Sequence, residues 1–204
     1  MPGSEFYPET SAELEKELCS TVQRFRDVLA LRPKILKCFA DQGVQVEGWL
    51  KGELLAFLTE EWAAGRIAGF DREVLVGVGK RKADLTIDLQ VGSQQCCAWV
   101  ELKHYLIGNQ MGVQYNAYGY FNDRTNGIRP DIEKLLSIPS PHRYVLTLMA
   151  SNPGTTDWKS GIARYNEKFH RCLRPLTEPD EFPESFFLGL IAVDEERAST
   201  ITGA

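Results

Sequence analysis

Two neighbouring apolar segments, Asp84–Val91 and Cys97–Leu102, constrain the fold of this chain more than any other feature. In the first segment, Leu85, Ile87 and Leu89 alternate with polar residues, which is typical of a β-strand whose two faces meet different surroundings. A Gly-Ser-Gln sequence separates the two segments, and such residues favour turns. So short a connection joins antiparallel strands, and we therefore expect a β-hairpin here.

Helices and further strands are predicted on both sides of this hairpin. Apolar residues at helical spacing predict one or two helices over 11–40, interrupted near Pro33, and a further helix over 47–64. A Val- and Leu-rich segment predicts a strand over 73–78. After the hairpin, we expect helices over 113–120, 131–138 and 157–173, and strands over 144–149 and 186–193.

This order of elements predicts an α/β fold with a mixed central sheet flanked by helices. Short turns between the first three strands favour antiparallel pairing, whereas a helical crossover to the fourth favours a mixed sheet with helices on both sides. The 204 residues are enough for one domain. We divide it into a helical N-terminal extension (1–44), a core (45–150) and a C-terminal helix and strand (151–204).

Composition excludes several classes of protein. No run of eighteen apolar residues occurs, and the first residues do not resemble a secretory signal, so a cytoplasmic location is expected. The five cysteines form no Cys-x-x-Cys pair, which argues against a zinc site and a disulfide framework. The net charge of -5 requires that any binding of nucleic acid rely on a local basic patch, such as Lys80-Arg81-Lys82.

Glu101-Leu102-Lys103 ends the second strand of the hairpin and is the main candidate for chemistry. Glu101 and Lys103 are two residues apart, so their side chains lie on one face of the strand. Asp84, at the start of the preceding strand, supplies a second carboxylate. Two carboxylates and an ammonium held together suit binding of a divalent cation and orientation of a water against a phosphodiester.

Each residue of this group has an expected role. Asp84 and Glu101 would be ligands of Mg²⁺ or Mn²⁺, with the backbone carbonyl of Leu102 as a third ligand. Lys103 would orient the attacking water or help to deprotonate it. Glu53, on the helix before the strands, could reach the same metal directly or through water. A different interpretation also stays open, in which the motif is an exposed strand edge with a cross-strand ion pair.

With Asp84, Glu101-Leu102-Lys103 and an upstream helical glutamate, Glu53, the sequence resembles the PD-(D/E)xK nuclease superfamily, whose members include restriction endonucleases. The resemblance covers residues 45–150, and it implies a restriction-endonuclease-like core and hydrolysis of phosphodiester bonds. The proline that precedes the aspartate in the family is Ala83 here. The resemblance also suggests Gln110 or Gln114 as the glutamine that some members carry on the following helix.

Nucleic acid, DNA rather than RNA, is the expected substrate. The candidate contact residues are basic, aromatic or amide side chains near the motif: Lys80, Arg81, Lys82, Gln114, Tyr115, Arg124 and Arg129. Two alternatives stay open, an inactive domain of the same fold that binds nucleic acid or a protein, and an interaction protein that neutralises a partner. A homodimer is compatible with either.

Overall fold

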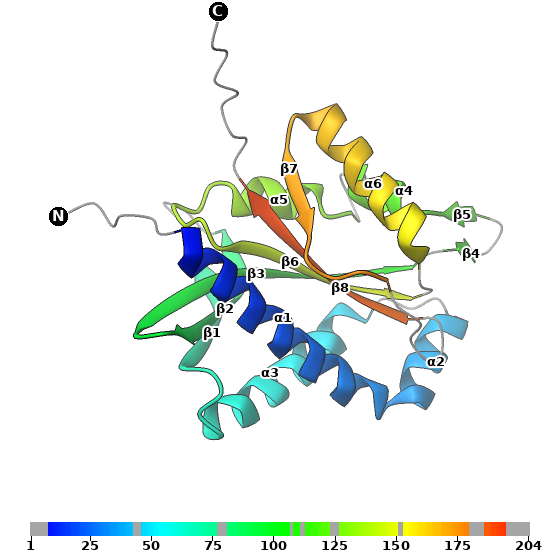
Figure 1. Ribbon diagram of the computed structural model, residues 1–204. Helices are drawn as coiled ribbons and strands as arrows, with labels where there is room; N and C mark the ends of the chain where they lie inside the picture. Colours follow the sequence, from blue (N-terminus) through cyan, green and yellow to red (C-terminus); the bar gives the residue numbers. More distant parts are fainter. Residues whose placement is uncertain are drawn as a thin grey trace, which may run out of the picture.

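A computed structural model describes residues 8–42, 46–76, 81–106, 108–110, 113–122, 127–150, 153–179 and 186–194. A twisted central sheet runs through the molecule, with helices on both faces (Figure 1). The predicted α/β architecture with a mixed sheet flanked by helices is therefore confirmed at this coarse level.

Within the described residues the sheet has six strands, and the antiparallel pairing predicted for the first three is confirmed. Across the sheet the strands lie in the order β1 (Gly69–Leu75), β2 (Lys82–Val91), β3 (Gln94–Leu106), β6 (Arg143–Ala150), β8 (Phe186–Asp194) and β7 (Cys172–Pro175). The β1, β2 and β3 strands pair antiparallel, whereas β6 pairs parallel with β3. A short hairpin of β4 (Gly108–Gln110) and β5 (Val113–Tyr115) forms a separate sheet.

Alternating side chains divide the interior into two cores. In β6, Tyr144, Leu146 and Leu148 join the core on one face, while Val145 and Met149 join the core on the other. The first face is covered by α1 (Pro8–Ala30), α2 (Pro33–Gln42) and α3 (Glu47–Ala63). The second is covered by α4 (Ala117–Asn122), α5 (Arg129–Leu135) and α6 (Gly154–Phe169). Nearly continuous apolar sequence in β6 and β8 follows from this burial on both faces.

The helix predicted over 113–120 is wrong in its first part. Residues 113–115 form β5, and α4 begins only at Ala117. Two side chains fix this start, because Asp157 accepts a hydrogen bond from the Ala117 N–H (3.0 Å) and Asn116 accepts one from Gly119 (2.8 Å). These bonds satisfy backbone donors that a helix leaves without partners in its first turn.

The helix predicted over 157–173 ends too late. Helix α6 stops at Phe169, and His170 takes a left-handed conformation (φ 48°) that turns the chain. Leu173 then lies in β7, where the Asn166 side chain bonds both its N–H (2.8 Å) and its carbonyl (2.9 Å). The side chain of Asn166 thus supplies partners for the chain that returns from the helix to the sheet edge.

Two glycines provide a matched test of packing in the helices. A Cβ added at buried Gly161 of α6 would lie 3.0 Å from Phe121 and 3.2 Å from the α4 backbone, whereas one at Gly52 of α3 would meet nothing within 4 Å. We expect Gly161→Val to lower the free energy of unfolding by about 1–3 kcal/mol. Gly52→Ala should raise it by roughly 0.5–1 kcal/mol. Urea denaturation measures both, and equal effects would contradict this packing.

Candidate active site

The site begins where β2 and β3 part. Their ladder runs from Val91↔Gln94 to Leu85↔Val100 and goes no further. Beyond it, the side chain of Asp84 takes the place of a backbone partner, and its Oδ2 accepts a hydrogen bond from the Leu102 N–H (3.0 Å). The Asp84 carboxylate thus takes up the N–H that β3 presents where β2 has left it. This contact places Asp84 beside the Glu-x-Lys motif.

A second carboxylate reaches the same edge from α3. Glu47, in the first turn of that helix, lies beside the backbone of His104 and 3.8 Å from Nζ of Lys103. The edge of β3 from Leu102 to His104 is therefore faced by the carboxylates of Asp84 and Glu47. This arrangement fixes Asp84 and Glu47 along one edge of the strand that carries Lys103.

Glu101 is the most buried acidic side chain of the site, with 1% of its surface exposed. Its Oε2 pairs with Nζ of Lys134 on α5 at 2.6 Å. Its Oε1 is buried and has no donor, while the carboxyl group as a whole lies close enough to Asp84 to share a hydrogen bond when one of the two is protonated. The two predicted ligands are therefore brought together by the fold.

The proximity of two carboxyl groups splits their pKa values. Burial raises the pKa of Glu101 to about 9, and the neighbouring Asp84 adds to this, although the Lys134 ammonium offsets part of it. Burial acts in the same direction on Asp84, but hydrogen bonds from Glu101, the Leu102 N–H and Lys51 outweigh it and lower the pKa of Asp84. These opposite shifts favour a protonated Glu101 beside an ionised Asp84 in the metal-free protein.

Helix α3 also supplies a lysine. Lys51 follows Glu47 by four residues and so lies on the same face of the helix. Its Nζ pairs with Oδ1 of Asp84 at 3.1 Å and also contacts the carboxylate of Glu73 on β1. Asp84 is therefore held from the strand by a backbone N–H and from the helix by an ammonium.

Lys103 lies between two carboxylates. Its Nζ is 3.4 Å from Oδ2 of Asp131 on α5 and 3.8 Å from Oε2 of Glu47 on α3. Asp131 also faces Lys134, at 3.8 Å, one helical turn along α5. Burial raises the pKa of Glu47 and of Asp131, while Lys103 acts against it in both cases.

These contacts form what we call the carboxylate–lysine network, which joins five elements from both sides of the sheet. Its members are Glu47, Lys51, Glu73, Asp84, Glu101, Lys103, Asp131 and Lys134. Acidic and basic groups alternate along it except at Asp84 and Glu101, where two carboxyl groups meet. With Glu101 protonated, four carboxylates face three ammoniums, and loss of the Glu101 proton would leave an excess of two negative charges, which is the charge a divalent cation would neutralise.

The structure does not bring Glu53 to the carboxyl pair, contrary to the prediction that it reaches the metal. Its carboxylate faces Arg32 at 3.9 Å, at the junction of α1 and α2. Six residues along a helix correspond to about 240° of rotation, so Glu53 cannot share the face of Glu47. On this helix it is Glu47, and not Glu53, that lies beside Lys103. Sequence reasoning missed Asp131 and Lys134, whose spacing of three residues was the available signal.

The predicted nucleic-acid contacts are only partly within the described chain. Lys80 and Arg124 lie outside the described residues, as do the side chains of Gln114 and Tyr115 in β5. Arg81 and Lys82 are exposed next to the start of β2. Arg129 is engaged within the fold, since it pairs with Glu133 at 3.2 Å and covers the Phe169 ring at 4.3 Å.

The oxygen-rich chemistry of the site fits a hard divalent cation in part. Among the described residues, no three His, Cys, Asp or Glu side chains are grouped so that they could hold a metal ion. The Asp84 and Glu101 carboxyls nevertheless converge, and the buried Glu101 Oε1 has no donor. Magnesium takes one or two carboxylates and keeps several waters, so two protein ligands satisfy its needs.

Comparison with known proteins adds no relative. No protein-family model matches the chain, and no curated protein sequence matches it significantly.

None of the described helices is both long and apolar enough to cross a membrane.

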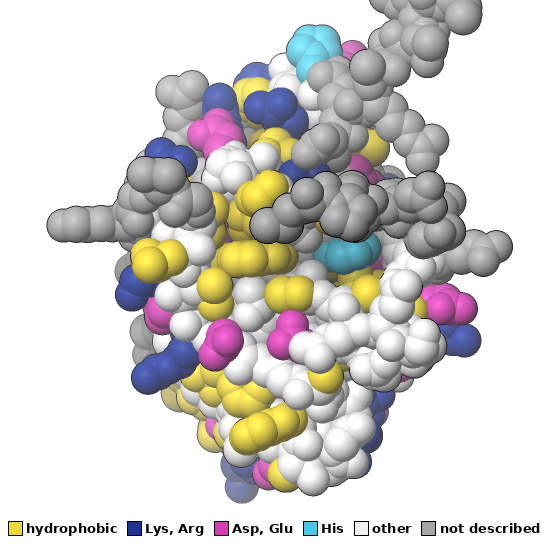
Figure 2. Space-filling view, turned by 90° about the vertical axis from the view of Figure 1, so that its left-hand side faces the viewer, with side chains coloured by type: hydrophobic (Ala, Val, Ile, Leu, Met, Phe, Trp, Pro, Cys, Tyr) yellow, Lys and Arg dark blue, Asp and Glu magenta, His cyan; other side chains and the backbone are white. Residues whose placement is uncertain are grey.

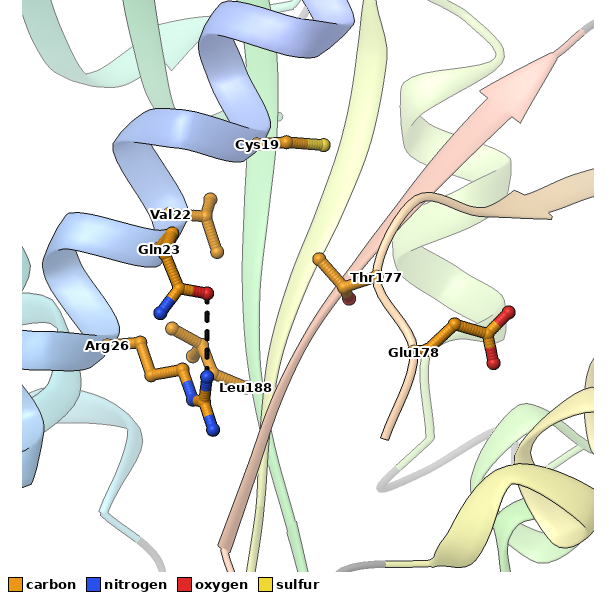
Figure 3. A pocket seen from close by; sticks show the side chains of 7 residues that line it. All are labelled: Cys19, Val22, Gln23, Arg26, Thr177, Glu178 and Leu188. Carbon is orange, nitrogen blue, oxygen red and sulfur yellow. Dashed lines mark hydrogen bonds between the residues drawn. The ribbon is translucent and has the colours of Figure 1, made fainter. Parts of the chain in front are cut away.

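Figure 2 shows the face of the molecule that lies at the left of Figure 1, and the described residues form no broad basic patch on it. On that face hydrophobic side chains gather near the middle, and Lys and Arg lie mainly at the margins (Figure 2). A hollow of about 300 Å³ lies between α1, the residues that follow β7, and β8. It shares no residue with the carboxylate–lysine network. Figure 3 shows its lining, namely Cys19, Val22, Gln23, Arg26, Thr177, Glu178 and Leu188.

The raised pKa of Glu101 predicts how stability depends on pH. The folded protein prefers protonated Glu101, so this contribution is complete below the unfolded value near pH 4.5 and declines as pH rises toward about 9. Glu101→Gln keeps the group neutral and lets its amide donate to Asp84. We expect it to stabilise the metal-free protein by on the order of 2 kcal/mol at pH 8, roughly 4–8 °C in Tm.

The control for this prediction is pH 5, where wild-type Glu101 is protonated in the folded state and the gain should be small. Thermal unfolding followed by circular dichroism at both pH values makes the comparison. A variant that melts below the wild type at pH 8 would show that Glu101 is buried as a stabilising carboxylate.

Proposed function

We propose that this protein is a metal-dependent nuclease that hydrolyses phosphodiester bonds in nucleic acid. The observation that carries the proposal is the meeting of the Asp84 and Glu101 carboxyl groups with a buried, donor-free oxygen between the network's lysines. Two carboxyl groups this close need a proton or a cation between them, and a site of oxygen ligands selects Mg²⁺ or Mn²⁺.

In this proposal two carboxyl groups hold the metal and one lysine positions the attacking water. Asp84 and Glu101 would hold the metal, with the Leu102 carbonyl as the proposed third ligand. When bound, the metal polarises the phosphate and lowers the pKa of a coordinated water. Lys103 is held between Asp131 and Glu47, at 3.4 and 3.8 Å, so its ammonium is positioned to orient the water and to offset charge developing on the phosphate.

The order of elements supports the same proposal. Helix α3 precedes three antiparallel strands, helical segments follow, and β6 then pairs parallel with β3. This is the order that the resemblance to PD-(D/E)xK nucleases implies for residues 45–150, with the aspartate on the second strand and Glu-x-Lys on the third. The agreement supports a restriction-endonuclease-like core as part of the proposal.

DNA is the proposed substrate, and its binding would be sensitive to salt. The net charge of -5 opposes contact with phosphates, so binding must use local cations such as the exposed Arg81 and Lys82. Both lie at the start of β2, within three residues of Asp84. Substrate phosphates approaching along this end of the strand would therefore arrive beside the carboxyl pair.

A second candidate is an inactive domain of this fold that binds nucleic acid or a protein partner. The observation in its favour is that all three lysines of the network already pair with carboxylates. A domain of this kind would bind DNA without cleaving it in the presence of Mg²⁺ or Mn²⁺, which separates the two candidates directly.

The proposal predicts loss of cleavage on substitution of the three motif residues. Asp84→Ala, Glu101→Ala and Lys103→Ala should each reduce Mg²⁺-dependent cleavage of DNA at least about 100-fold, because each removes a metal ligand or a transition-state contact. Circular dichroism confirms that the fold is kept. Full activity in all three variants would refute the assignment.

The two glutamates of α3 provide a sharper comparison. Glu47→Gln should slow cleavage by roughly tenfold or more, because Glu47 holds Lys103, which lies 3.8 Å away. Glu53→Gln should leave the rate within about twofold, since Glu53 faces Arg32 instead. Rates measured on one DNA substrate at saturating Mg²⁺ decide the matter, and the reverse ranking would show that the α3 face is wrongly assigned.

A further inference from the structure

The carboxyl pair is flanked by two lysines that arrive from opposite faces of the sheet. Lys51 of α3 contacts Asp84 at 3.1 Å, and Lys134 of α5 contacts Glu101 at 2.6 Å. Both ammoniums occupy carboxylate oxygens that a metal would otherwise use. A lysine and a metal ion therefore compete for the same ligands.

Each of these lysines also touches a second carboxylate outside the pair. Lys51 contacts Glu73, and Lys134 lies 3.8 Å from Asp131. Each ammonium can thus leave the pair and keep a partner of opposite charge. Both side chains are only partly exposed, so a second carboxylate lowers the cost of leaving the pair.

We propose that Lys134 and Lys51 are built-in counter-ions of the Asp84–Glu101 pair, which hold it together without metal and yield to a divalent cation by moving to Asp131 and Glu73. The inference rests on the metal site of the proposed function and does not depend on nuclease chemistry. It makes metal binding an exchange of cations, in which Glu101 releases its proton to the solvent and neither lysine loses its ion pairing.

The exchange gives a reason for Lys103 and Lys134 to share one carboxylate. Lys134 shares Asp131 with Lys103, so a shift of Lys134 toward Asp131 weakens the hold of that carboxylate on Lys103. Lys103 then becomes freer to contact an incoming phosphate. Metal binding at Glu101 is in this way coupled to release of the lysine proposed to act on the substrate.

Titration calorimetry with Mn²⁺ tests the competition. Removing a competing ammonium should tighten binding, so Lys134→Met and Lys51→Met should each lower the Kd for Mn²⁺ about tenfold. Lys103→Met removes the same charge from the network without freeing a ligand of the pair, and should change the Kd by at most about threefold. Lys159→Met, at an exposed lysine paired with Glu178, should leave it unchanged.

Thermal unfolding gives a second measurement, the melting temperature with and without Mn²⁺. Loss of one charge in general would not make the melting temperature recover when Mn²⁺ is added. Lys134→Met leaves Glu101 without its partner, so the variant should melt below the wild type without metal and approach it at saturating Mn²⁺. If Lys134→Met does not fold, Lys51→Met decides alone, through both measurements.

Several results would overturn the inference. These are a Kd for Mn²⁺ that is unchanged or weaker in both Lys134→Met and Lys51→Met, an equal gain in Lys103→Met, or no binding of Mn²⁺ by any form. Tighter binding in the two variants, together with a wild type that cleaves no nucleic acid, would support the counter-ion role and refute the proposed nuclease.

Discussion

Repulsion between two neighbouring carboxyl groups, the partly exposed Asp84 and the buried Glu101, is the constraint around which the site is organised. Their closeness requires a proton or a metal, and the pKa of Glu101 is raised to about 9 in the metal-free protein. The fold accepts this cost because β2 and β3 part after Leu85 and Val100, so that Asp84 bonds the freed Leu102 N–H. Lys51 and Lys134 contact this pair directly, and Glu73 and Asp131 contact these two lysines in turn.

The two helical layers meet at this point of the sheet. Helix α3 brings Glu47 and Lys51 from one side, and α5 brings Asp131 and Lys134 from the other. Since the helices belong to different hydrophobic cores, their positions are fixed independently by packing. The site is therefore built on rigid elements, which is what a precise arrangement of charged groups requires.

The sequence predicted those parts of the structure that depend on local pattern. Alternation at Leu85, Ile87 and Leu89 predicted β2, and the spacing of Glu101 and Lys103 predicted their common face. The sequence did not reveal that α3 turns Glu47 rather than Glu53 toward β3, because the rotation of the helix is set by burial of Leu50, Leu54 and Leu58 against the sheet and α1. The part of α5 in the site could not be inferred either, since contacts between Lys134 and Glu101 arise only when the crossover from β3 to β6 is folded.

The most direct test of the central claim is a crystal structure of the protein with bound Mn²⁺, located by its anomalous scattering. If the carboxyl pair is the cation site, a peak lies within about 2.0–2.3 Å of an oxygen of Asp84 and an oxygen of Glu101. A structure at saturating Mn²⁺ in which the peak lies elsewhere, with Lys134 still on Glu101, would contradict it.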